Sequence, residues 1–158
     1  MEGERINAMA NKTSEGLTVI RLQMVKETIE YYGTKKVRSP ADVEEVVRTF
    51  IGHADREVFI ALNLSTANNI NSIHVVSIGT LNQSIVHPRE CFKAALLSNA
   101  DAVIFAHNHP SGEVIPSAED KQITMKLREC GQLLNIRVLD HVIVGDKGYF
   151  SFQENSLL

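Results

Sequence analysis

Apolar and polar positions follow two patterns along the chain, short apolar runs and apolar residues spaced three or four apart. Short runs rich in Val, Ile and Phe predict buried strands, and strict alternation predicts a strand with one buried face. These patterns predict main strands over residues 17–25, 57–64, 73–78, 102–106 and 138–144, and a short segment 149–152 after a turn at 146–148. On the first strand the more apolar side should face the core, and it is formed by Thr18, Ile20, Leu22 and Met24.

Three helices are predicted between the strands by their caps and their apolar spacing. Ser39-Pro40 starts the first, because Ser is a favoured cap and Pro fits the first helical position, and Gly52 should end it. Pro88 opens the second, which Asn99 closes, and Ser117 caps the third. The side chains expected to face the core are Val43, Val46, Val47, Phe50, Phe92, Ala95, Leu96, Ile123, Leu127, Cys130 and Leu134. Strands interleaved with helices indicate an α/β layer structure.

The length of the chain favours one globular domain, and its net charge bears on the binding of nucleic acid. A chain of 158 residues is typical of a single domain and can bury about 70% of its unfolded surface. Residues 1–16 are polar and predict a flexible leader, so the domain should span residues 17–158. The formal net charge of −3 gives no support for nucleic-acid binding by the molecule as a whole.

The apolar segments and the cysteines indicate a protein of a reducing compartment. No apolar stretch approaches the roughly 18 residues that a membrane helix needs, and the N-terminus lacks the apolar region of a signal peptide. Cys91 and Cys130 form no Cys-x-x-Cys pair, so we expect reduced thiols on helices of the core. A cytoplasmic protein without a membrane partner is therefore expected.

Polar side chains suited to a metal ion follow the strand over residues 102–106. His107 and His109 are two positions apart, so in an extended backbone both imidazoles point to the same side. A loop with Pro and Gly leads to the helix cap Ser117, and Asp120 lies one turn into that helix. Two imidazole nitrogens and one carboxylate oxygen are a usual ligand set for a catalytic zinc, with a fourth position left for water. The sequence thus predicts a Zn²⁺ site formed by His107, His109 and Asp120.

The spacing of these residues resembles that of the JAMM metalloenzymes. Their pattern is His-x-His, seven residues, Ser, two residues and Asp, and residues 107–120 match it without a gap. The segments 87–90, 106–112 and 140–145 resemble the RadC branch of that superfamily, in a short stand-alone form without the helix-hairpin-helix region. The resemblance covers roughly residues 35–152. It implies a JAB/MPN-type mixed curved β-sheet flanked by helices, similar to the cytidine-deaminase architecture, and hydrolysis of a peptide or isopeptide bond.

A metal-activated water needs a base, and three carboxylates are candidates. The metal lowers the pKa of the water to about 7, and a carboxylate can then take its proton and pass it to the leaving group. Glu57 opens a buried strand, where a carboxylate has no packing reason to be, and it matches the JAMM upstream glutamate, fifty residues before His107. Asp55 and Glu90 are the alternatives, although Glu90 also suits the first turn of a helix.

Four further side chains near this stretch leave alternatives open. Ser117 can cap the helix or donate its hydroxyl to a developing oxyanion. Asp120 can complete a capping box with Ser117 instead of binding metal, but the box leaves both histidines unexplained. His141 can orient a metal ligand or be an ordinary core or surface histidine. His53 has no partner at ligand spacing and is expected at the surface.

Two functions of different class follow from the sequence. The first is a zinc-dependent JAMM-type hydrolase with a peptide or protein substrate, in which Glu57 is the base and Ser117 assists. The second is a DNA-repair-associated accessory protein or nuclease, because the RadC family carries a DNA-repair name, although the net charge does not favour nucleic acid. The sequence predicts no oligomeric state.

Overall fold

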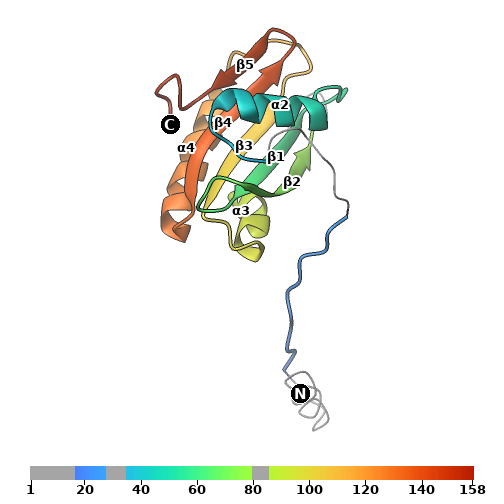
Figure 1. Cartoon of the computed structure of the whole chain (residues 1–158), viewed down its shortest axis with the longest axis vertical. Helices are drawn as coiled ribbons and strands as arrows, with labels where there is room; N and C mark the ends of the chain where they lie inside the picture. Colours follow the sequence, from blue (N-terminus) through green and yellow to red (C-terminus); the bar gives the residue numbers. More distant parts are fainter. Residues whose placement is uncertain (1–16, 28–34, 80–85) are drawn as a thin grey trace.

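The computed structural model describes residues 17–27, 35–79 and 86–158. The elements in these ranges are α2 (Pro40–Ile51), β1 (Val58–Leu64), β2 (Ile70–Ile78), α3 (Pro88–Leu97), β3 (Ala102–Asn108), α4 (Ala118–Leu134), β4 (Arg137–Gly145) and β5 (Gly148–Ser151). The strands form one five-stranded sheet in the order β2-β1-β3-β4-β5 (Figure 1).

Helices cover both faces of the sheet, and each face has its own apolar core. On one face, Val43, Val46 and Val47 of α2 pack in a cluster with β1, β3 and β4. On the other face, Phe92 of α3 and Leu127 of α4 pack in a second cluster with β1 and β3. This arrangement confirms the expected α/β layer structure.

The pairing of the central strands determines which chain ends meet at one edge of the sheet. β1 runs antiparallel to both β2 and β3, and Phe59 lies opposite His107. β3 and β4 run parallel, with His107 opposite Ile143, so the sheet is mixed. Because α4 connects these two parallel strands, its N-terminus lies at the edge where both of them end. The histidine-containing end of β3 and the start of α4 are therefore brought together by the topology.

The helix ends lie close to their predicted positions. Ser39 caps α2 with its side chain, Pro40 is at the start, and Gly52 is the C-cap. Ser117 caps α4 in the same way, through a capping box with Asp120. Asn99, predicted to close α3, lies just after it in the left-handed conformation, with φ of 51°.

The predicted strand over residues 17–25 is wrong. Residues 17–27 form no strand, and the side that was expected to face the core is open to solvent, with Ile20 73% and Leu22 72% exposed. An alternating sequence supplies one apolar face, but a strand also needs a neighbour for its backbone groups. None of the described strand pairings includes this segment. The expected leader, residues 1–16, lies outside the described residues.

Two helix positions expected in the core are also exposed. Leu96 is 52% and Leu134 is 42% exposed. Both lie in the last turn of their helices, beyond the stripes of side chains that contact the sheet.

Cys91 lies in the buried stripe of α3. Cys91 and Cys130 are both free thiols, as expected. Burial raises the pKa of the Cys91 thiol to about 12.

No helix in the described part of the chain is both long and apolar enough to cross a lipid bilayer.

Candidate metal centre

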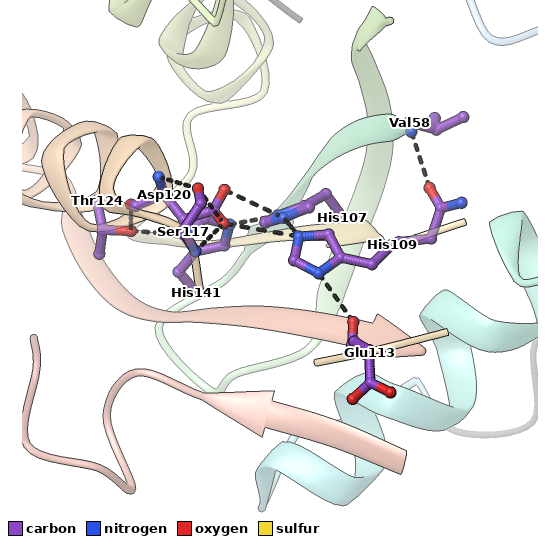
Figure 2. Close-up of polar contacts among 9 residues, drawn as sticks. Val58, His107, His109, Glu113, Ser117, Asp120, Thr124 and His141 are labelled. Carbon is purple, nitrogen blue, oxygen red and sulfur yellow. Dashed lines mark hydrogen bonds and ion pairs between the residues drawn. The ribbon is translucent and has the colours of Figure 1, made fainter. Parts of the chain in front are cut away.

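Three predicted ligands meet where β3 ends and α4 begins. His107 is the penultimate residue of β3 and is fully buried, whereas His109 follows the strand and is 16% exposed at its side chain. Asp120 comes from the first turn of α4. Figure 2 shows the two imidazoles and the carboxylate directed toward one another.

The distances between their ligand atoms suit one shared cation. His107 Nε2 lies 3.0 Å from His109 Nε2 and 3.3 Å from Asp120 Oδ1, and His109 Nε2 lies 3.6 Å from Asp120 Oδ2. The three residues form the one group of this kind found in the described ranges, with ligand atoms all within 4.8 Å of one another. The predicted ligand set is thus brought together.

A buried chain of hydrogen bonds fixes which nitrogen of His107 carries its proton. The Thr124 hydroxyl donates to the Asp120 carbonyl at 2.6 Å, so it can only accept from His141 Nδ1, also at 2.6 Å. Burial lowers the pKa of His141 well below its ordinary value, so this ring is neutral and its Nε2 is an acceptor. His107 Nδ1, 2.8 Å from His141 Nε2, must therefore donate. In its neutral form His107 therefore presents the lone pair of its Nε2 to the site.

A backbone carbonyl determines which ring nitrogen of His109 carries its proton. The Glu113 carbonyl lies 2.9 Å from His109 Nδ1 and can only accept, so Nδ1 carries a proton and, in the neutral ring, Nε2 has a lone pair (Figure 2). Two nitrogen lone pairs and one carboxylate therefore converge on one point. Such groups repel one another unless a cation or a proton lies between them. The donor set fits Zn²⁺, which prefers imidazole and carboxylate ligands and a tetrahedral site.

The charges of the site follow from the same contacts. Burial opposes ionisation of Asp120, but its contacts with His107 and His109, which are hydrogen bonds when a proton occupies Nε2, outweigh burial and hold the pKa of this carboxyl well below its ordinary value. The hydrogen bond with Asp120 is the largest cause that raises the pKa of His109, and the charge of Glu57 adds a small contribution. Asp120 is thus anionic and attracts a cation, whether this is a proton or a metal ion.

Asp120 takes part in the capping box and also faces the histidines. Its Oδ2 accepts hydrogen bonds from the backbone N–H and the hydroxyl of Ser117, both at 2.7 Å, while Oδ1 lies near His107. Capping therefore does not compete with metal binding. It holds the carboxylate in place. The Ser117 hydroxyl proton is donated to Asp120, so a contribution of Ser117 to an oxyanion stays a prediction.

Among the three candidate bases, Glu57 has the suitable location. It is half-buried and immediately precedes β1, and its charge influences His109. Asp55 is exposed and pairs with Arg56 at 2.9 Å. Glu90 is in the first turn of α3, as expected, and pairs with Lys93 at 2.7 Å. The catalytic role of Glu57 stays a prediction.

Support for the ligands comes from side chains that sequence reasoning left open or missed. His141 contacts His107 directly, which favours the orienting role over an ordinary core position. The contact depends on the parallel register of β3 and β4, which places His141 opposite Phe105, two residues before His107, and the sequence carries no signal for that register. Thr124, four residues after Asp120, was not singled out. His53 is exposed, as expected, and lines a cavity of about 200 Å³ that borders His109.

The mixed sheet with a His-His-Asp group at its edge agrees with the fold and site that the resemblance to JAB domains implied. The family model of the RadC-like JAB domain matches residues 37–157, and the chain belongs to this family. A "UPF0758 protein" of Desulfitobacterium hafniense is 48% identical over 122 residues, which are 77% of this chain and 54% of that protein. A "UPF0758 protein" of Rubrobacter xylanophilus is 48% identical over 126 residues, 80% of this chain and 55% of that protein.

A third relative matches over more of the chain. The "UPF0758 protein" of Methanosarcina mazei is 44% identical over 147 residues, which are 93% of this chain and 64% of that protein. The chain thus spans between about half and two thirds of the length of these relatives. The predicted RadC-like membership is confirmed.

Proposed function

We propose that the protein is a zinc-dependent hydrolase of the JAMM type that cleaves a peptide or isopeptide bond. The observation that carries this proposal is the convergence of the His107 and His109 Nε2 lone pairs with the Asp120 carboxylate at one edge of the sheet. Three protein ligands with nitrogen and oxygen donors are typical of catalytic zinc sites, whereas structural zinc sites use four.

The chain's own residues supply the remaining parts of a hydrolytic site. A bound zinc ion would polarise the scissile carbonyl and activate the attacking water. Glu57 would take the proton of that water and give it to the departing amine, a role in which a positioned carboxylate acts as base and then as acid. Ser117 would assist at the oxyanion by turning its hydroxyl from Asp120 to the substrate oxygen.

The Asp120 contacts support this division of roles. The carboxylate keeps the bond from the Ser117 backbone N–H, at 2.7 Å, even when the hydroxyl turns away. Ser117 is exposed and can therefore face a substrate, while His107 is closed off from solvent. The reaction class is taken from the JAMM resemblance, because a fold alone does not define chemistry.

The test combines metal analysis with a substrate screen. The purified chain is loaded with zinc and incubated with fluorogenic peptides, an isopeptide-linked peptide and single-stranded DNA, and Glu57→Gln serves as the matched control. Zinc-dependent cleavage of an amide substrate that is lost in Glu57→Gln supports the proposal. Cleavage of DNA alone, or equal rates with and without zinc, would refute it.

A further inference from the structure

Asn108, the residue between the two histidines, bonds to neither of them. Successive residues of a strand point to opposite faces, so the Asn108 side chain points to the α2 side of the sheet, away from His107. It is 4% exposed. Its Oδ1 accepts a hydrogen bond from the Val58 backbone N–H at 2.8 Å, and its Nδ2 donates to the Arg56 carbonyl at 3.0 Å. Figure 2 draws the bond at Val58.

These two hydrogen bonds replace backbone pairing at the point where β3 leaves β1. The ladder between the two strands reaches the pair Phe59 and His107. Beyond it the backbone of β3 turns to β4, because the His109 N–H donates to the Val144 carbonyl at 2.9 Å. The backbone of β3 therefore offers no partner to the Val58 N–H and the Arg56 carbonyl. The side-chain amide of Asn108 bonds to both of these groups instead. His109 can therefore turn into the metal site while β1 stays in place.

The residue held between these two bonds is Glu57. Asn108 binds the residue before it and the residue after it, and the Glu57 carbonyl accepts from the Gly79 N–H at 2.8 Å on the other side of β1. The backbone of Glu57 is thus fixed on both sides, two residues before Phe59, which lies opposite His107, so Glu57 is on the same face of the sheet as His107. The two Asn108 bonds need a side chain that both donates and accepts, since one partner is a donor and the other an acceptor, and the Asn amide does both.

We propose that Asn108 is a positioning residue that holds Glu57 at the metal site. The inference rests on the proposed role of Glu57 as the base. In this assignment Asn108 acts on the reaction through the backbone of residues 56–58 and contributes nothing to metal binding itself. It predicts that substitution of Asn108 reproduces the loss of Glu57 function while the metal stays bound.

The test uses the full chain loaded with Co²⁺ in place of zinc. The visible absorption of Co²⁺ reports its coordination, and it changes with pH when a coordinated solvent molecule ionises. Glu57→Gln removes a negative charge near the ion and should lower the pH midpoint of this change by about 1 pH unit. Asn108→Leu and Asn108→Ala, which remove both bonds without adding a charge, should lower it in the same direction with Co²⁺ still bound. The double variant Glu57→Gln/Asn108→Leu should show no further shift, because both changes act on one group.

Asn63→Leu is the matched control, because Asn63 is an equally buried amide of β1 that bonds to Ser72 at 3.0 Å. It should leave the midpoint unchanged. A shift in Glu57→Gln but none in either Asn108 variant would overturn the positioning role and leave the proposed function standing. No shift in Glu57→Gln would overturn the proposed base, and the positioning role with it. Loss of Co²⁺ from both Asn108 variants would mean that Asn108 supports the histidines instead, which also overturns the inference.

Discussion

His141→Leu is the substitution whose effect follows most directly from the hydrogen-bond chain. Leu has a similar volume but cannot accept a hydrogen bond, so the His107 Nδ1 proton loses its acceptor at 2.8 Å. His107 is then free to move that proton to Nε2, where it blocks the lone pair that faces the site. We therefore expect weaker zinc binding although no ligand has been changed.

The magnitude can be estimated in two ways. A buried donor without a partner costs about 1–3 kcal/mol. Loss of a group that orients a metal ligand typically lowers affinity by about 10–100-fold, which corresponds to about 1.4–2.7 kcal/mol. The two estimates agree, so the zinc Kd of His141→Leu should rise by about 10–100-fold. Thr124→Val removes the acceptor for His141 Nδ1, 2.6 Å away, together with the hydroxyl's bond to the Asp120 carbonyl, but it leaves the acceptor for His107 in place and should have a smaller effect in the same direction.

The assay is competition for zinc with a chromophoric chelator, well below the unfolding midpoint of each variant. Low temperature is needed because His141 also stacks on Phe152, with ring centroids 4.9 Å apart, and its loss should lower the thermal midpoint. His53→Leu is the control, since His53 is exposed and outside the ligand group. A folded His141→Leu protein with a Kd within about twofold of the unsubstituted chain would refute the assignment of the proton on His107.

Three further predictions concern the base, the pH dependence and the N-terminal segment. Glu57→Gln should keep its zinc and lose about 10²–10⁴ in turnover once a substrate is known, and loss of zinc would instead make Glu57 a ligand. The pKa of His109 is raised by Asp120, so below that pKa a proton occupies Nε2 and above it the lone pair is free. Zinc affinity measured from pH 8 to pH 5 should therefore fall as the pH drops through a value above about 6.5, and a constant affinity down to pH 5 would contradict this. Removal of residues 1–27 should change the thermal midpoint by less than about 2 °C, because residues 17–25 are exposed, whereas a larger loss would show that this segment packs on the domain.

The grouping of the His107, His109 and Asp120 side chains was predictable because their arrangement is local. His107 and His109 are two residues apart at the end of a strand, and Asp120 lies one turn inside a helix that has to start at the same edge. Strand periodicity and helix capping are therefore enough to bring the three side chains together. The same spacing offered the capping box of Ser117 and Asp120 only as an alternative to metal binding, whereas the structure shows the box in a residue that also faces the histidines.

Contacts that depend on strand pairing were not predictable from the sequence. His141 reaches His107 only because β4 lies beside β3 in one particular register, and single-sequence patterns give no register. The Asn108 bonds across to β1 have the same origin. Residues 17–25 show the opposite case, in which a clear strand pattern has no pairing partner in the described structure. Periodicity identifies a face, but it does not identify the neighbour that covers it.

The central claim is that His107, His109 and Asp120 hold one zinc ion, and metal analysis of the purified protein tests it most directly. We predict one zinc per chain for the unsubstituted protein and for Glu57→Gln after removal of loosely bound metal. We predict none for Asp120→Ala or for His107→Ala/His109→Ala. Full zinc occupancy in the double histidine variant would contradict the site.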